Sequence, residues 1–118
     1  MLTSHAIAVA WLDAFNRHDV DGLIALYADD ATHTSPKIRV LHPETGGTIV
    51  GKPAIRAWWA GAVARLPGLS YQAATITATA ERAVIEYIRH APDGPPMPIA
   101  EAFDLRDGRV VASRVYHG

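Results

Sequence analysis

The stretch YADDATHTSPK, residues 27–37, predicts where the chain passes from helix to sheet. Asp29 and Asp30 are expected to end a preceding helix, because short acidic side chains compete with its backbone for hydrogen bonds. Residues 31–35 then predict a short strand, and Pro36 is expected to end it because proline has no backbone N–H. The stretch therefore indicates a helical layer joined directly to a sheet.

The predicted strand carries two polar side chains on one face, because side chains alternate along a strand. They are His33 and Ser35. A single histidine fits a hydrogen-bonded wall residue as well as a catalytic group, and both roles stay open for His33. The connection that follows, residues 36–50, is long enough to be functional and ends in a short predicted strand at 48–50. We expect this connection to cover the mouth of a pocket.

Apolar residues at helical spacing predict three helices: residues 3–17, a short helix that Asp19 caps, and residues 53–66. Their large inward-facing residues are Trp11, Phe15, Leu23, Ile24, Tyr27, Ile55, Trp58 and Trp59. Adjacent helical residues point about 100° apart, so Trp58 and Trp59 are not expected to be equally buried. Core filling is the simpler role for both, and one of them is a candidate for the cavity mouth or for a partner interface.

The rest of the chain predicts four strands, because its apolar alternation is interrupted only at turn-forming residues. The strands are expected at residues 69–79, 82–91, 97–106 and 109–117. Helices followed by antiparallel strands favour one α+β domain over residues 1–118, with the helices on one face of a sheet.

The composition excludes several classes of function. The chain has 118 residues, no cysteine, and a net charge of −1 from 11 basic and 12 acidic residues. Disulfides, thiolate catalysis and zinc–cysteine sites are therefore excluded, and no basic cluster predicts a nucleic-acid partner. The apolar runs are shorter than a membrane span and the first residues lack a signal-peptide pattern. We expect a cytoplasmic protein without a membrane partner.

One acidic residue lies on an apolar strand face. Alternation places Glu101 with Ile99, Phe103 and Leu105, so its carboxyl group must find a partner or bind a proton. A structural ion pair with an arginine and a role in a pocket both remain open for Glu101. The pocket role is favoured, because active sites concentrate acids with perturbed pKa values.

Two further strand residues are candidates for the same pocket. Glu86 lies on a strand whose two faces are equally mixed, so it faces either a cavity or solvent. His117 shares a face with Val111 and Ser113, opposite Val110. Because His117 lies near the chain end, a loosely ordered terminal side chain is the alternative to a pocket role.

Three segments resemble the nuclear transport factor two-like superfamily, and its SnoaL-like and ketosteroid-isomerase-like members in particular. The segments are WLDAFNRHDVDGLIALYADDATHTSP, GKPAIRAWW and EAFDLRDGRVVASRVYHG, which together span nearly the whole chain. The resemblance implies a cystatin-like cone, in which a curved, mixed or antiparallel sheet and three helices enclose an apolar pocket. It also implies a homodimer through the outer face of the sheet.

Laid along this sequence, the functional residues of ketosteroid isomerase fall on four positions. Its general-base aspartate falls on Ser35, its oxyanion tyrosine on Trp11 and its protonated aspartate on Glu101. An aromatic pocket residue falls on His117. Serine is no base at neutral pH, and tryptophan donates only through its indole N–H. Steroid isomerisation by that mechanism is therefore excluded, and only the acid that such a site holds neutral is retained.

Two classes of function stay open. The first is an enzyme of isomerase, cyclase, hydrolase or dehydratase type, which acts on an apolar cyclic or polyketide-like molecule by general acid–base chemistry without a cofactor. Its candidate catalytic residues are Glu101, His117 and His33, and a hydrogen bond between Glu101 and His117 would suit this role. The second is a non-catalytic ligand-binding or dimeric assembly module. The expected ligand contacts are Trp11, Phe15, Tyr27, Ser35, Trp58, Tyr71, Glu86 and Phe103. No metal site is expected, because the histidines show no local ligand spacing.

Overall fold

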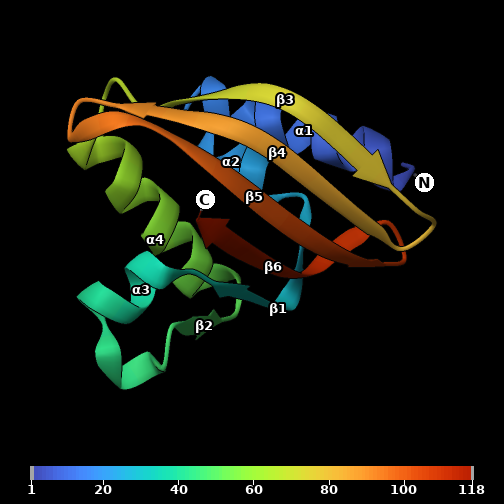
Figure 1. The fold of residues 1–118 in the computed structure, drawn as a ribbon. Coiled ribbons are helices and arrows are strands. Elements are labelled where there is room, and N and C mark those ends of the chain that lie inside the picture. Colours follow the sequence, from blue (N-terminus) through green and yellow to red (C-terminus); the bar gives the residue numbers. More distant parts are fainter. Residues whose placement is uncertain (1, 118) are drawn as a thin grey trace.

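The computed structural model describes residues 2–117 as a six-stranded sheet with helices packed on its inner face (Figure 1). The α-helices are α1 (Ser4–Asn16), α2 (Val20–Ile24), α3 (Pro36–Leu41) and α4 (Lys52–Arg65), and a short 3-10 helix is η1 (Pro43–Thr45). The strands are β1 (Tyr27–Thr34), β2 (Thr48–Val50), β3 (Ser70–Ala78), β4 (Arg82–Ala91), β5 (Gly94–Arg106) and β6 (Arg109–His117).

The sheet is mixed and strongly curved. Its strand order is β2-β1-β6-β5-β4-β3, in which β1 and β6 are parallel and all other neighbours are antiparallel. In Figure 1, β3, β4 and β5 bend across the top of the molecule with α1 and α2 behind them, while α4 lies at one end. The predicted α+β class is confirmed, and the last strand of the chain lies in the middle of the sheet.

The second helix begins where its cap was predicted. Asp19 accepts a hydrogen bond from the backbone N–H of Gly22 at 2.9 Å, which satisfies one of the free donors of the first turn. The first helix is capped in the same way, because the Thr3 hydroxyl accepts from the N–H of Ala6 at 3.1 Å. Side-chain caps therefore fix the starts of both helices.

The stretch at 27–37 differs from its prediction. Helix α2 already ends at Ile24, and Asp29 and Asp30 lie inside β1 and not at a helix end. The pairing of β1 with β6 is irregular between Tyr27 and Thr32, and both carboxylates are exposed there. Solvent satisfies them, so two adjacent acids are compatible with a strand at this irregular point.

The connection at 36–50 is not a loop throughout. Its first six residues form α3, because the Ser35 hydroxyl accepts from the N–H of Lys37 at 3.1 Å and Pro36 suits a first helical turn. Only Ile38 of this helix is buried, so the sequence shows no helical period. The described residues therefore form four α-helices and not three.

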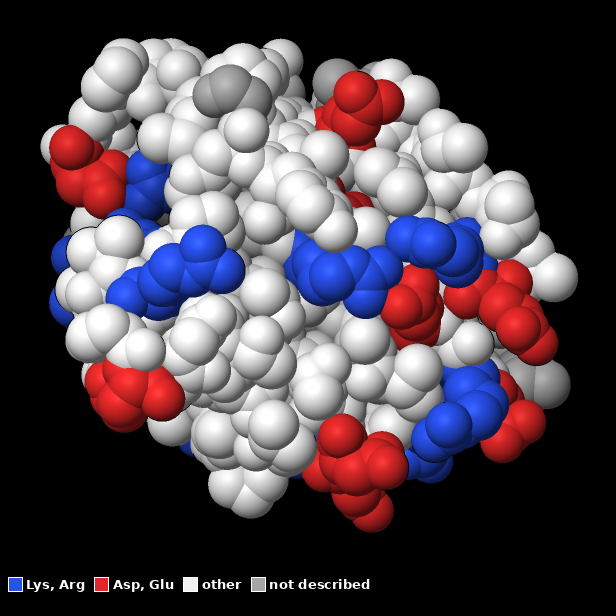
Figure 2. Space-filling view, turned by 60° about the horizontal axis from the view of Figure 1, so that its bottom comes forward, with Lys and Arg blue, Asp and Glu red and all other residues white. Residues whose placement is uncertain are grey.

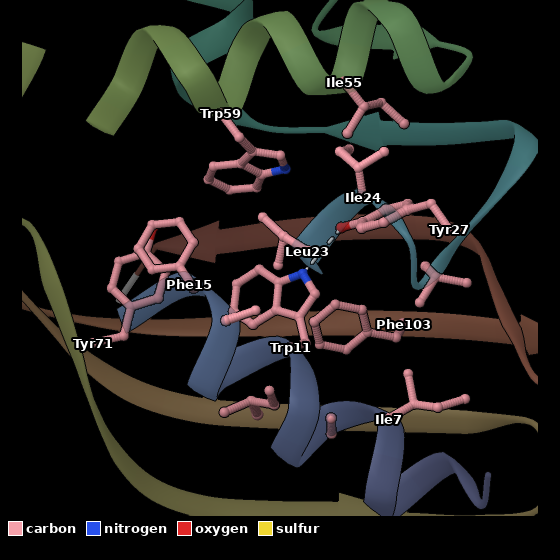
Figure 3. Packing of buried hydrophobic residues seen from close by; sticks show 14 of the residues in the cluster. Ile7, Trp11, Phe15, Leu23, Ile24, Tyr27, Ile55, Trp59, Tyr71 and Phe103 are labelled. Atoms are coloured by element: carbon pink, nitrogen blue, oxygen red, sulfur yellow. Dashed lines mark hydrogen bonds between the residues drawn. The ribbon is translucent and has the colours of Figure 1, made fainter. Parts of the chain in front are cut away.

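Aromatic side chains fill the space between the helices and the sheet (Figure 3). Phe15 stacks on Tyr71 with ring centroids 3.9 Å apart, and Trp11 meets Trp59 edge-on at 6.0 Å. Trp11 is fully buried. Burial of such large apolar surfaces is the main favourable contribution to this fold.

Charged side chains are mixed on the surface. On the face that Figure 2 shows, basic side chains form a band across the middle, and acidic side chains lie beside most of them. Exposed ion pairs of this kind, such as Arg56 with Asp21 at 2.7 Å, contribute little to stability. None of the described helices is both long enough and apolar enough to span a membrane.

Candidate functional site

The inner face of the sheet holds three buried polar side chains among apolar ones. Glu101 on β5, Ser113 on β6 and His33 on β1 are each 0% exposed. The strand register places Glu101 between Ile85 of β4 and Val115 of β6. The inward direction that alternation predicted for Glu101 is therefore confirmed.

Glu101 is not paired with an arginine. The Tyr87 hydroxyl donates a hydrogen bond to Oε1 at 2.9 Å, and Oε2 has no partner within the described part of the chain. Burial raises the pKa of Glu101 to about 8, and the Tyr87 hydrogen bond opposes this only in part. Glu101 is therefore mostly protonated at neutral pH, and the alternative of a structural ion pair with arginine is wrong. Because Oε1 accepts from Tyr87, the proton belongs on Oε2.

A run of buried hydrogen bonds links α1 to β1. The Trp11 indole N–H donates to the Tyr27 hydroxyl at 3.1 Å, as the dashed line in Figure 3 marks. The Tyr27 hydroxyl lies 3.1 Å from the Ser113 hydroxyl, which in turn lies 2.6 Å from Nδ1 of His33. Polar groups that would be costly to bury alone are therefore connected to one another.

Only one placement of protons gives every hydroxyl in this run an acceptor. Trp11 can only donate, so Tyr27 accepts from it and donates to Ser113, which donates to Nδ1 of His33. Burial lowers the pKa of His33 to about 3, so its ring is neutral and its single proton lies on Nε2. Nε2 is buried without a hydrogen-bond partner among residues 2–117. His33 therefore holds an unused N–H donor on the far side of its ring from Ser113.

Two adjacent cavities share part of their walls, and His33 lines the inner one. The inner cavity has a volume of about 60 Å³, and its polar lining includes His33, Ser35, Tyr71, Tyr87 and His117. Trp58, Leu66 and Leu69 supply apolar walls. The outer cavity is wider, about 420 Å³, and shares Lys37, Arg89 and His117 with the inner one. The inner cavity holds only a few water-sized groups, so the body of any larger ligand belongs in the outer cavity.

Five predicted site residues line the inner cavity: His33, Ser35, Trp58, Tyr71 and His117. Four predicted ligand contacts lie in the core instead, namely Trp11, Phe15, Tyr27 and Phe103. Figure 3 shows the reason, because these side chains point toward one another and form part of the buried apolar cluster. Trp59 packs with them, and its indole nitrogen lies on the side of Ile24 and Tyr27, away from Tyr71.

The two strand glutamates lie apart from the inner cavity for different reasons. Glu101 is absent from the lining of the inner cavity, although its neighbours Ile99 and Val115 belong to it, and its carboxyl group lies against the Tyr87 hydroxyl. Glu86 is exposed and borders a shallow depression on the outer sheet face that also includes Tyr116. The choice that the sequence left open for Glu86 is therefore decided in favour of solvent.

His117 lines both cavities but does not pair with Glu101. It lies opposite Ile99, whereas the carboxyl group of Glu101 contacts Tyr87, so the expected hydrogen bond between the two is not formed. Desolvation, followed by the positive charges of Arg89 and Lys37, lowers the pKa of His117. The ring is therefore neutral at pH 7.

A register shift changes one predicted face of β6. The β5–β6 pairing is irregular between Asp104 and Leu105, so Val110 pairs with Leu105 while Ala112 pairs with Asp104. Val110 is consequently buried, where strict alternation predicts the opposite face from Ser113.

Five polar residues that the site uses were not predicted: Lys37, Arg65, Tyr87, Arg89 and Ser113. Tyr87 and Arg89 share the face of Ile85, so the burial of that face was the missing signal. Ser113 lies on the same strand face as His117. Its signal was a small polar residue on a face that carries a candidate site residue. Lys37 was missed because α3 was not predicted. Within residues 2–117, no three His, Asp or Glu side chains gather as metal ligands would.

Comparisons with solved structures support the fold. A SnoaL-like protein of unknown function from Burkholderia thailandensis is 27% identical, with a TM-score of 0.85, over 98% of this chain and 94% of that one. A Sinorhizobium meliloti protein with the provisional name polyketide cyclase is 22% identical, with a TM-score of 0.79, over 93% of each chain. A cystatin-fold protein from Novosphingobium aromaticivorans is 19% identical, with a TM-score of 0.80, over 98% of this chain and 99% of that one.

A search of curated proteins gives no match. The model of the SnoaL-like domain matches residues 8–113. The SnoaL-like fold suggests a protein with a small-molecule pocket, and the two cavities agree with this. The chain therefore belongs to the SnoaL-like family of the nuclear transport factor two-like superfamily.

Proposed function

We propose that this SnoaL-like protein is a cofactor-independent enzyme of isomerase, cyclase or lyase type, which moves a proton next to a carbonyl group of a small apolar molecule. The observation that carries the proposal is the unused N–H of His33, whose Nε2 is buried and whose residue belongs to the wall of the inner cavity. Leaving a buried donor unpaired costs about 1–3 kcal/mol, which a ligand oxygen would recover. A donor fixed by Ser113 would also stabilise negative charge that grows on that oxygen.

His117 is the basic group in this proposal. Its pKa is lowered, so the ring is neutral at pH 7 and has a free lone pair. It lies in the walls of both cavities, where the carbon next to a bound carbonyl would pass. A neutral imidazole in that place can accept the carbon's proton and return it at another carbon or to a leaving group.

Glu101 takes part in the proposal through Tyr87. Tyr87 lines the inner cavity, and its hydroxyl donates to Glu101, whose carboxyl group is neutral because of its burial. A neutral acid in this position keeps the Tyr87 ring oriented without placing a negative charge beside the developing oxyanion. Glu101 is thus a positioning residue in this scheme, and His33 and His117 are the residues that contact the reacting group.

A binding module remains the second candidate, and one observation favours it. Glu101 is hydrogen-bonded to Tyr87 and does not belong to the lining, so among the described residues no carboxylate lines the inner cavity to serve as a base. In that case His33 and His117 would only orient a bound molecule.

Exchange of carbon-bound hydrogen tests the proposal directly. Beta-tetralone, an apolar bicyclic ketone, would be incubated with the protein in D₂O, and loss of its α-hydrogen signal followed by NMR. We expect the protein to accelerate exchange, and His117→Gln to reduce that acceleration about a hundredfold, as for loss of a general base. His5→Gln, an exposed histidine on α1, is the matched control and should retain it. Binding of the ketone without faster exchange would favour the binding module.

A further inference from the structure

We infer that the molecule bound in these cavities is an apolar acid, and that Lys37 and Arg89 recognise its carboxylate where the two cavities meet. This inference rests on the proposed small-molecule site and names the class of its ligand. The first observation is the charge of the lining. Lys37 and Arg89 line both cavities, and Arg65 lines the inner one. No acidic side chain lines the inner cavity within the described chain.

Asp93 holds the Arg89 guanidinium in place and uses only some of its N–H donors. The Arg89 side chain is only 14% exposed, and two of its N–H groups bind the two carboxylate oxygens of Asp93, each at 2.9 Å. A guanidinium has five N–H donors, so three remain for a ligand. Asp93 therefore orients the planar group without using up its capacity to bind a second carboxylate.

The charge at this junction is not balanced, because three cations but only one carboxylate, that of Asp93 in the wall of the outer cavity, line the two cavities within the described chain. The Lys37 ammonium lies 3.5 Å from the carboxylate of Asp93, which already binds Arg89. One carboxylate thus serves two cations, with Arg65 as a third cation on the inner side. A bound anion would reduce the repulsion among these groups, whereas a neutral or cationic ligand would not.

The outer cavity supplies the complementary apolar surface. Its walls include Pro36, Val40, Pro95 and Met97. Val40 is 77% exposed, which leaves apolar area that a ligand body would cover. The volume of about 420 Å³ lies in the usual range for small-molecule sites. An apolar body with one carboxylate matches both the walls and the junction, and a uniformly polar ligand matches neither.

A pair of probes that differ only in charge tests the inference. Trans-cinnamate and trans-cinnamamide have the same shape, and their affinities would be measured by NMR titration of the labelled protein. We expect cinnamate to bind about tenfold or more tightly than the amide, as for a charge-assisted pair. Raising the salt concentration should weaken only cinnamate binding.

Substitutions test which residues cause the preference for cinnamate over cinnamamide. Arg89→Met should remove most of the preference for cinnamate and leave the affinity for cinnamamide unchanged, which also shows that the variant folds. Lys37→Met should reduce the preference less, because the Lys37 side chain is 41% exposed and its ammonium cannot form the two parallel hydrogen bonds of a guanidinium. Arg109→Met is the matched control, because Arg109 is exposed at the opposite end of β6 from His117.

The outcomes separate this inference from the proposed function. Equal affinities for cinnamate and cinnamamide in the unmodified protein would overturn the acid preference and leave the small-molecule site intact. A preference that survives in both Arg89→Met and Lys37→Met would overturn the assignment to this junction. If neither probe binds, the small-molecule site is overturned together with the inference.

Discussion

Two carboxylates on one strand have opposite environments. Glu101 and Asp104 both lie on β5, on opposite faces of the sheet. Glu101 is 0% exposed and accepts one hydrogen bond from the neutral Tyr87 hydroxyl. The side chain of Asp104 is 36% exposed and lies 2.8 Å from Arg114 and 3.3 Å from Arg82. Desolvation raises the pKa of Glu101 to about 8, whereas hydrogen bonds from Arg114 lower that of Asp104.

The difference comes from position and not from residue type. Side chains alternate along a strand, so one face meets the core and the other meets solvent and its charged neighbours. On the inner face a carboxyl group stays protonated and becomes available as a neutral donor. On the outer face the same group is ionised and pairs with cations. Three substitutions test this comparison, from the largest expected effect to the smallest.

Glu101→Gln should change how stability depends on pH. Above the ordinary pKa of 4.5 the unfolded chain ionises Glu101, while the folded protein keeps the proton until about pH 8. The contribution of Glu101 to the free energy of unfolding is therefore fully present below pH 4.5. It is lost as the pH rises toward 8, by up to about 1.4 kcal/mol per pH unit. Urea denaturation at several pH values should show a flatter profile for the variant. Glu86→Gln, exposed on the outer face, is the control, and parallel profiles for Glu101→Gln and the unmodified protein would contradict the prediction.

Ser113→Ala should break the buried run of hydrogen bonds. It leaves the Tyr27 hydroxyl and Nδ1 of His33 without the partner that joins them. We expect a loss of about 1–3 kcal/mol in the free energy of unfolding, measured by chemical denaturation. Thr34→Val removes a hydrogen bond to Thr48 in a half-buried place and should cost less. A Ser113→Ala protein as stable as the unmodified one would mean that the run contributes nothing to the inner face.

Asp104→Asn should have the smallest effect. The pKa of Asp104 is lowered, so its contribution to the free energy of unfolding is present above the ordinary pKa of 3.8 and is lost as the pH falls. This pH dependence is opposite to that of Glu101. Because the ion pairs are partly exposed, we expect about 0–1 kcal/mol at neutral pH, and less at high salt. Thermal melts at low and high salt would measure this. A loss that is larger at high salt would contradict the electrostatic origin.

Most of the fold could be predicted because its signals are local. The cap at Asp19, the apolar spacing of α4 and the turn at Asp107–Gly108 each depend on a few neighbouring residues. Helix α3 was missed because it has only one buried residue and therefore no period. The Ser35–Pro36 pair was its one signal, since serine caps a helix and proline suits its first turn. The start of β1 was missed because two acids disfavour a strand everywhere except at an exposed irregularity.

The candidate site was less predictable, because its contacts join distant parts of the chain. Alternation correctly placed Glu101 on the inner face, but it does not show that Glu101 is hydrogen-bonded to Tyr87 and absent from the cavity lining. The register between strands decides which rows line a cavity, and that register is not a local property. Trp11 and Phe15 were correctly predicted to be buried, yet whether a buried aromatic contacts a ligand or another ring depends on the whole cone.

The central place of β6 has a consequence for how the protein is made. Its partner β1 is synthesised early, and the contact between His33 and Ser113 spans 80 residues of sequence. Such a long-range pairing slows folding, because a large loop must close before the contact forms. On the ribosome, β1 and β2 must wait until β6 has emerged, with their hydrogen-bonding edge uncovered in the meantime. The unused donor of His33 is thus among the last features of the molecule to take shape.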